Sequence, residues 1–151
     1  MIGVDNVIAF PACEALPLVS KPAPMLTGHD VERIETLRAC AKAALLVPRC
    51  DVDRACALIT ADKTESVSAY ATTLLALLAE FSFQKTVFYP NGAEEFSDSE
   101  VWLSRALRAA QHGHSAQARA LVSWRVKPMG HRRALYLIDG LAEAFCAQLL
   151  D

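Results

Sequence analysis

The stretch SVSAYATTLLALLAEFSF, residues 66–83, is the most apolar run of the sequence. Its large apolar residues recur at steps of three and four, and alanines fill much of the remaining circumference, which is typical of a helix that is apolar on most sides. Ser, Thr and Glu80 interrupt the run, whereas a membrane-spanning helix needs about 20 mostly apolar residues. We therefore predict the central helix of a helical bundle. Its large apolar residues are Val67, Tyr70, Leu74, Leu77, Leu78 and Phe81.

The composition indicates one domain with more apolar residues than its size requires. A chain of 151 residues can bury a core without disulfides or metals, and 53% of its residues are hydrophobic. Because a small domain has a large surface for its volume, this excess predicts an apolar surface that binds a partner. We expect a protein partner or a second copy of the chain.

Charge and cysteine content exclude several classes of protein. The net charge of −2 excludes a uniformly basic nucleic-acid binder, although basic residues outnumber acidic ones after residue 96. The five cysteines form no C-x-x-C pair, so neither a disulfide framework nor a zinc knuckle is indicated. No basic and apolar leader opens the sequence, so we expect a cytoplasmic protein.

Four prolines punctuate the first 25 residues and disfavour helix there, so we predict an extended arm over residues 1–26 and one helical-bundle domain over 27–151. Thr27 and Asp30 mark the first helix start. The pattern places an apolar stripe on one side of this helix and a solvent-exposed mixed-charge face on the other. The stripe is Val31, Ile34, Leu37, Ala41 and Leu45, and the charged face is Glu32, Glu35, Arg38 and Lys42.

Acidic residues open the next elements. Asp51 and Asp53 begin a short predicted helix that ends at Ile59, where first-turn carboxylates suit the helix dipole. A D-x-D pair is also a metal-binding alternative, but no further oxygen ligands lie nearby in the sequence. Asp62 and Glu65 stand at capping-box spacing before the central helix.

Residues 81–96 change in character, because aromatic residues surround the turn signal Pro90-Asn91-Gly92. A period of two over residues 81–89 is compatible with a short strand. We interpret the segment as a loop whose aromatic side chains cover the end of the bundle, and a ligand-lining lip is the alternative. The candidate site residues are Phe83, Phe88, Tyr89 and Phe96.

Three helices follow. Ser97 and Glu100 form a capping box, Gly113 suits the end of that helix, and Ser115 is placed to cap the next. The last helix is predicted to begin near His131. Inner faces are predicted at Trp102, Leu103, Ala106, Leu107 and Ala110, at Ala118, Leu121 and Val122, and at Ala134, Ile138, Leu141, Phe145 and Leu149.

The predicted hairpin at residues 100–128 resembles two families. Ala109 and Gly113 stand as they do in a DNA-reading helix-turn-helix, but charged residues occupy positions that this family keeps apolar. Trp102, Ala106, Gly113 and Ala118 stand at the spacing of one tetratricopeptide-type repeat, which needs at least three copies to form a solenoid. We interpret this second resemblance as shared helical-hairpin packing rather than membership.

Two clusters of side chains are candidate sites. His112 and His114, with His131 as a third ligand, are the metal alternative, but end-of-helix histidines are common and we assign no metal. Basic residues crowd the start of the last helix after the flexible Gly130, against the helix dipole, and this arrangement suits a phosphate or carboxylate. These candidate anion-binding residues are Lys127, His131, Arg132 and Arg133. The alternative is that their side chains extend into water, or that Arg132 or Arg133 pairs with an acidic residue of the N-terminal half.

The pattern as a whole predicts an all-α bundle of about five helices. No phosphate-binding, dinucleotide-binding, hydrolase or zinc-protease motif is present, so we assign no catalytic residue and no cofactor, and an enzyme stays an open alternative. We expect a non-catalytic, self-associating interaction or regulatory module. A small-ligand or anion sensor is the alternative, and a nucleic-acid-binding regulator is the third.

Overall fold

The structure is a computed structural model that describes residues 26–44 and 67–150. These residues form five α-helices, one 3₁₀ turn and no strand, which confirms the all-α bundle. The predicted arm, the short helix at residues 51–59 and the capping signals Asp62 and Glu65 lie outside the described residues. The elements are α2 (Gly28–Ala44), α4 (Val67–Phe81), α5 (Asp98–Gln111), α6 (Ser115–Arg125), η2 (Pro128–Gly130) and α7 (His131–Leu150).

The chain divides into two compact units, Met1–Val31 and Glu32–Asp151. In the first unit, the side chains of Thr27 and Asp30 cap the start of α2, as predicted. The Thr27 N–H donates to Asp30 Oδ2 at 2.9 Å, and the Asp30 N–H donates back to Thr27 Oγ1 at 3.3 Å. This reciprocal pair satisfies two backbone donors at the helix start.

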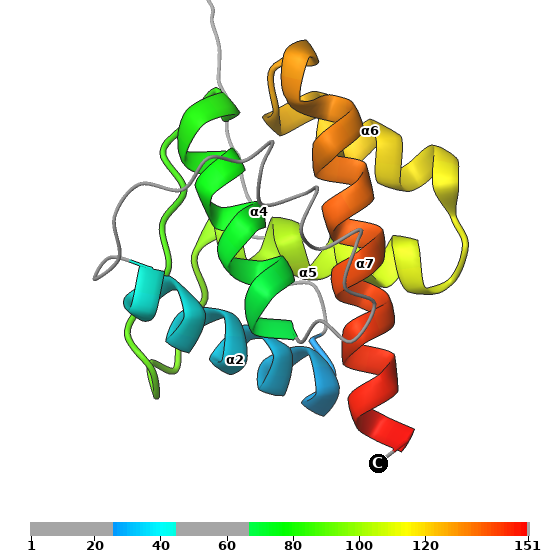
Figure 1. The fold of residues 1–151 in the computed structure, drawn as a ribbon. Helices are drawn as coiled ribbons and strands as arrows, with labels where there is room; N and C mark the ends of the chain where they lie inside the picture. The colour runs from blue at the N-terminus through cyan, green and yellow to red at the C-terminus, as the bar shows by residue number, and fades with distance from the viewer. Residues whose placement is uncertain (1–25, 45–66, 151) are drawn as a thin grey trace, which may run out of the picture. The chain divides into compact units, whose positions relative to one another are not determined.

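Within the second unit, α7 rather than α4 contacts most of the other helices, because it packs on α4, α5 and α6 (Figure 1). The sequence predicted α4 as the central helix. Its apolar character comes partly from Leu75 and Ala76, which the fold leaves only partly buried. Gly140 on α7 lets α4 approach closely, because a Cβ atom there would overlap the Tyr70 ring.

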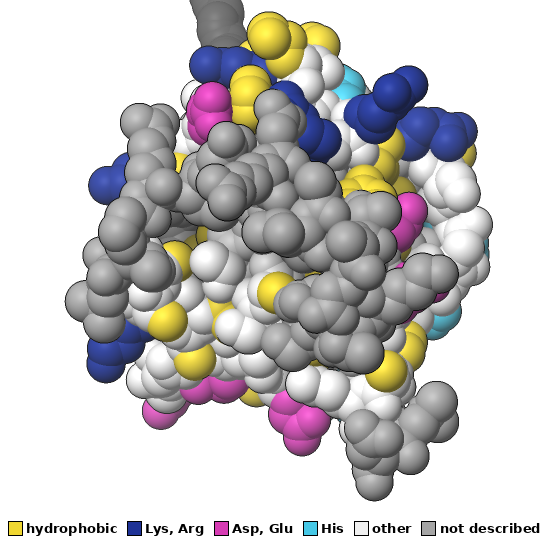
Figure 2. All heavy atoms as spheres, viewed as in Figure 1, with side chains coloured by type: hydrophobic (Ala, Val, Ile, Leu, Met, Phe, Trp, Pro, Cys, Tyr) yellow, Lys and Arg dark blue, Asp and Glu magenta, His cyan; other side chains and the backbone are white. Residues whose placement is uncertain are grey.

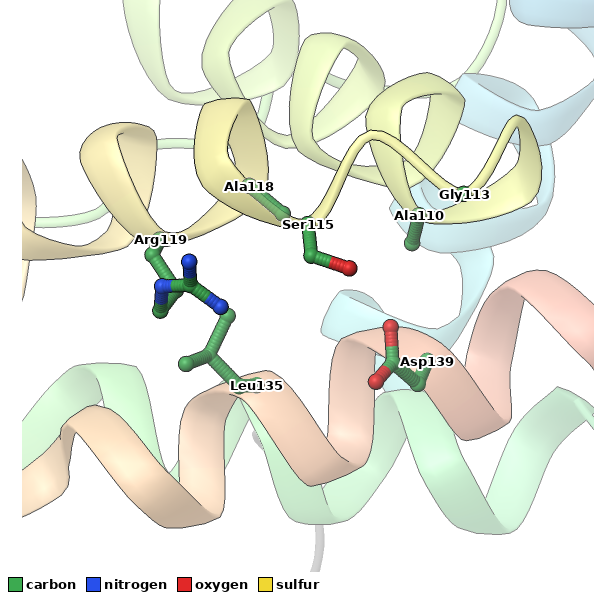
Figure 3. Close-up of a pocket in the computed structure, with 7 residues that line it drawn as sticks. All are labelled: Ala110, Gly113, Ser115, Ala118, Arg119, Leu135 and Asp139. Atoms are coloured by element: carbon green, nitrogen blue, oxygen red, sulfur yellow. The ribbon is translucent and has the colours of Figure 1, made fainter.

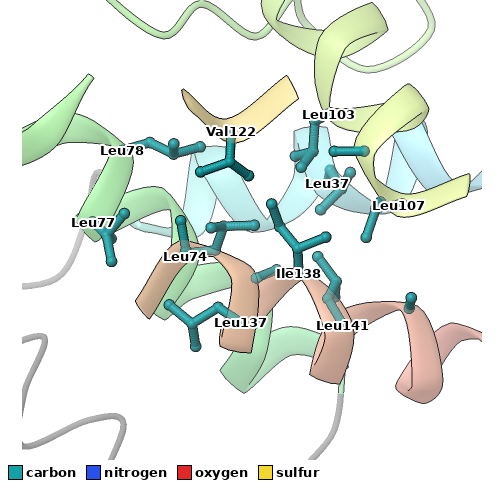
Figure 4. Close-up of a cluster of buried hydrophobic side chains, with 14 of the residues drawn as sticks. Leu37, Leu74, Leu77, Leu78, Leu103, Leu107, Val122, Leu137, Ile138 and Leu141 are labelled. Carbon is teal, nitrogen blue, oxygen red and sulfur yellow. The ribbon is translucent and has the colours of Figure 1, made fainter. Parts of the chain in front are cut away.

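Side chains from five helices meet in one hydrophobic core (Figure 4). Ile138 lies near its centre, surrounded by side chains from the other helices. The fold buries most of the inner faces predicted for α5, α6 and α7, with Leu137 and Ala142 in addition. Ala110 and Leu121 are only partly buried, and the side chain of Leu149 lies outside the described ones. The largest fully buried apolar residues are Ile34, Leu37, Leu74, Leu77, Leu78, Leu103, Leu107, Val122, Leu137, Ile138 and Leu141.

Two predictions for α2 are wrong. Val31, assigned to the apolar stripe, is exposed, and Arg38, assigned to the solvent-exposed face, is only 2% exposed. Arg38 is buried because its partner, Glu100, comes from a helix 62 positions away in the sequence. No local pattern on α2 reveals such a partner.

The turns around α6 are confirmed in part. Gly113 adopts φ +72°, the left-handed conformation that favours glycine after a helix. Ser115 does not cap α6, since His114 occupies the cap position and makes no side-chain capping bond. Gly130 is buried and packs so closely on Phe81 and Val126 that an added Cβ atom would lie 3.0 Å from their side chains.

Residues 82–97 form a loop and not a strand. Ser82 and Val126 make a single antiparallel bridge, in which the Phe83 N–H donates to Arg125 O and the Lys127 N–H donates to Phe81 O. The pairing stops there because α6 ends and η2 begins on either side of Val126. The bridge nevertheless ties the end of α4 to the end of α6.

Candidate interaction surface

A buried ion pair holds the 82–97 loop against α2. Arg38 Nε donates to Glu100 Oε2 at 2.7 Å and Arg38 Nη2 donates to Glu100 Oε1 at 3.0 Å, which is the bidentate geometry that arginine favours. The remaining guanidinium N–H groups donate to Glu35 and to the carbonyls of Ala93 and Glu95. All five donors of Arg38 therefore have acceptors.

The Glu100 carboxylate is satisfied just as fully. In addition to Arg38, it accepts the backbone N–H of Ser97 at 2.8 Å and that of Tyr89 at 2.9 Å. The capping box predicted for Ser97 and Glu100 is present, but its carboxylate also serves the ion pair. Sequence reasoning missed this second role, because only the Ser97–Glu100 spacing is a local signal.

Further hydrogen bonds fix the rest of the loop. Ser97 Oγ donates to Val87 O and the Val87 N–H donates to Ser99 Oγ at 3.0 Å. At the turn, the Asn91 side chain and the Gly92 N–H donate to the Glu35 carboxylate. With the Ser82–Val126 bridge at its other end, the loop is held at both ends, so it presents its exposed side chains from a fixed backbone.

The electrostatics of this network are those of a structural pair and not of a catalytic acid or base. Burial favours the neutral carboxyl of Glu100, but the hydrogen bonds from Arg38, Ser97 and Tyr89 outweigh it and hold its pKa below the ordinary value. The carboxylate hydrogen bonds raise the pKa of Arg38 against the opposing effect of burial. Both groups stay charged near neutral pH, whereas a general acid or base needs a pKa close to it.

The lowered pKa of Glu100 predicts a loss of stability in acid. A carboxyl whose folded pKa lies below its unfolded value of about 4.5 stabilises the fold above that value and loses this contribution as the pH falls through the folded pKa. We expect the difference in free energy of unfolding between the native protein and Glu100→Gln to shrink steadily below pH about 4.5. Urea unfolding at a series of pH values measures it, and a constant difference would contradict the assignment.

Three large apolar side chains are exposed at the end of the bundle where α4 and α6 end and α7 begins. Trp124 is 83% exposed, Met129 is 79% exposed and Phe83 is 59% exposed. The Phe83 N–H donates to Arg125 O, so the backbone of Phe83 lies next to the residue that follows Trp124. Met129 precedes Gly130, which packs against the Phe81 side chain. We call Phe83, Trp124 and Met129 the tryptophan patch.

Three exposed cations lie close to the tryptophan patch in the sequence. Lys85 is two residues from Phe83, Lys127 is two residues from Met129 and Arg132 is three residues from it, whereas Glu80 is the exposed acidic residue at the end of α4. In Figure 2, hydrophobic and basic side chains gather at the upper edge of the view, at this end of the bundle. Arg125 is used internally, because its guanidinium lies 5.5 Å from the centre of the Trp102 ring and bonds Ser99 Oγ.

The fold separates the four candidate aromatic residues. Phe83 is exposed in the tryptophan patch, while Phe88 packs against the core. The Phe96 ring lies 5.2 Å from the Arg38 guanidinium, and Tyr89 contributes its backbone N–H to Glu100. The four side chains therefore have different surroundings, and the ligand-lining lip stays a prediction.

The candidate anion-binding residues lie together at the start of α7 but have different surroundings. Lys127 and Arg132 are exposed. His131 Nε2 lies 2.6 Å from Val126 O, and Arg133 lies 5.2 Å from the centre of the Phe81 ring. The backbone N–H of His131 donates to Pro128 O, so this group does not point toward an anion site.

The histidine alternative gains no third ligand. The rings of His112 and His114 lie 5.9 Å apart, centre to centre. No group of three His, Cys, Asp or Glu side chains in the described residues is arranged to hold a metal ion.

None of the helices in the described residues combines the length and hydropathy that crossing a bilayer requires.

A small cleft of about 150 Å³ lies between the α5–α6 turn and α7 (Figure 3). The Ser115 hydroxyl and the Asp139 carboxylate face each other across it, with Arg119 beside Leu135 at one side. Burial, and then the charge of Glu143, raise the pKa of Asp139. Ligand pockets usually measure about 300–1,000 Å³, so this cleft is small for an organic ligand.

Comparison of the chain with protein-family models, with curated proteins and with solved structures finds no match.

Proposed function

We propose that this protein is a non-catalytic interaction module that binds a protein partner through the tryptophan patch. The observation that carries the proposal is the exposure of Trp124 at 83%, together with that of Met129 at 79%. Tryptophan is the side chain most enriched among residues that dominate binding at protein interfaces, and methionine adapts to varied partners. The two anchored ends of the 82–97 loop support the proposal, because a pre-organised surface loses less entropy on binding.

The size of the tryptophan patch limits the affinity that we expect for a partner. Burying each of its three large side chains contributes about 1.5–3 kcal/mol. Association costs about 4–15 kcal/mol in lost freedom of motion, so these three side chains alone roughly offset it. Binding through the patch therefore needs polar contacts around it, and we expect a reversible complex rather than a permanent one.

Self-association, which the composition predicts, stays a prediction. Sedimentation velocity over a range of protein concentrations tests it, with Trp124→Gln as the matched variant. A concentration-dependent dimer that Trp124→Gln abolishes would make the patch the contact between copies. A strict monomer would leave the patch for a different protein.

The two tryptophans of the chain make a matched pair of predictions. Trp124→Gln removes an exposed side chain, so we expect the free energy of unfolding to change by less than about 0.5 kcal/mol. Trp102 is 6% exposed and its indole N–H donates to Leu121 O at 2.9 Å, so Trp102→Phe should cost about 1–2 kcal/mol. Urea unfolding followed by circular dichroism measures both. A large loss for Trp124→Gln would mean that this residue serves the fold instead.

Site-specific photo-crosslinking in the source cells tests the interaction itself. A photoreactive phenylalanine analogue replaces Trp124 in one variant and Gln117, also exposed on α6, in the control. We expect a discrete protein adduct from position 124 and none from position 117. Equal adducts from both positions, or none from position 124, would contradict the proposal.

A further inference from the structure

We infer that the partner presents an acidic segment to the tryptophan patch, with carboxylates flanking apolar anchors. This inference rests on the proposed function, because it assigns the chemistry of the partner at the same surface. It comes from the charges around the patch rather than from its apolar members.

The cations near the tryptophan patch differ in their contacts with the rest of the fold. Arg125 stacks on Trp102 and bonds Ser99, and Arg133 stacks on Phe81, so both guanidinium groups have internal contacts. Lys85, Lys127 and Arg132 are exposed, one on the loop, one at the α6–η2 junction and one on α7, each within three residues of a patch member in the sequence. Rim charges of one sign steer a partner of the opposite sign and reject a partner of the same sign.

The same charges argue against a second copy at this surface. In a symmetric dimer each surface meets its own copy, so Lys127 and Arg132 of one chain would approach the same cations of the other. Like charges brought together at an interface disfavour the pairing. A partner with carboxylates at the corresponding positions has no such penalty and pairs with all three cations.

A membrane is the weaker choice of acidic surface. Peripheral binding to anionic lipid commonly uses clusters of four to eight basic residues or an attached lipid chain. Three exposed cations, Lys85, Lys127 and Arg132, neighbour the tryptophan patch in the sequence, and Glu80 lies at the same end of the bundle. This number of cations fits a protein segment with a few carboxylates better than a bilayer surface.

Selection from a random-peptide display library against the full-length chain tests the inference. We expect the enriched peptides to be rich in Asp and Glu around large apolar residues. Fluorescence anisotropy of labelled peptides then gives affinities. Trp124→Ala should weaken binding about 30-fold or more, and the Lys127→Glu, Arg132→Glu double variant about tenfold or more. A higher salt concentration should also weaken the binding of the acidic peptides.

A matched charge control separates the patch from the net charge of the molecule. The Lys42→Glu, Arg105→Glu double variant makes the same change in net charge at exposed positions on α2 and α5. We expect it to reduce the affinity less than twofold. An equal loss from both double variants would overturn the assignment of the acidic segment to this patch.

The remaining outcomes distinguish the two proposals. Enriched peptides that require Trp124 but are neutral or basic would overturn the acidic partner and leave the proposed function standing. Peptides whose binding never requires Trp124 would overturn both. Co-sedimentation with phosphatidylserine vesicles that Trp124→Ala abolishes would replace the protein partner by a membrane, and dimerisation lost in Trp124→Ala would replace it by a second copy.

Discussion

Replacing Arg38 with Met is expected to lower the free energy of unfolding by about 3–5 kcal/mol, since it leaves the charge of a buried partner uncompensated. Glu100 is fully buried, and Arg38 supplies two of the four hydrogen bonds that its carboxylate accepts. The substitution also leaves the carbonyls of Ala93 and Glu95 without the guanidinium donors that join them to α2. Urea unfolding followed by circular dichroism measures the loss.

Controls separate the ion pair from other effects of the substitution. Lys42→Met changes the same charge on the same helix at an exposed position, so it should cost less than about 0.5 kcal/mol. In Arg38→Met the pKa of Glu100 should rise, because burial then acts without the guanidinium, and NMR titration detects it. A loss below about 1 kcal/mol would mean that the pair contributes little beyond its own desolvation.

Truncating Ile138 to Ala should cost about 2–5 kcal/mol, because it removes transfer energy and leaves a cavity. Ile138 is fully buried near the centre of the core, where neighbouring helices limit how far the cavity can collapse (Figure 4). The same unfolding measurement gives the value. A cost near that of a surface substitution would place the centre of the core elsewhere.

Two further variants of α7 show whether the loss of stability follows the volume removed from the core. Ile138→Val removes one methyl group and should cost about 0.5–1.5 kcal/mol. Gln148→Ala, at an exposed position of the same helix, should change stability by less than about 0.5 kcal/mol. This order of the three costs follows from the volume removed from the core. Equal losses for all three would instead point to a general weakening of α7.

Local patterns were sufficient for the helices and most of their buried faces. The step of three and four predicted α4, and the capping box at Ser97 and Glu100 predicted the start of α5. Gly113 predicted the α5–α6 turn, since its left-handed conformation is a local requirement of the chain. These features depend on residues within a few positions of each other, so the sequence displays them directly.

The sequence did not show which helix contacts the most other helices. The sequence indicated that residues 66–83 are apolar on most sides, but α7 contacts more of the other helices than α4 does. Hydrophobic periodicity reports which face of a helix is buried, whereas it does not report how many neighbours share that face. Gly140 lets α4 and α7 approach each other because its missing side chain leaves room for the Tyr70 ring. In the sequence it is only a glycine inside a helical pattern, and nothing local shows that Tyr70 lies beside it.

The sequence by itself determined the all-α class, the approximate extents of the described helices and most of their apolar faces, because each depends on spacing along one element. Only the tertiary structure decided that Arg38 is buried, that Glu100 has two roles, and that Phe83 pairs with Arg125. Basic residues at the start of the last helix were visible in the sequence, yet the exposed apolar patch near them was not. The physical reason is distance along the chain: these pairs form between separate helices and loops, and no local pattern encodes a partner that folding alone brings near.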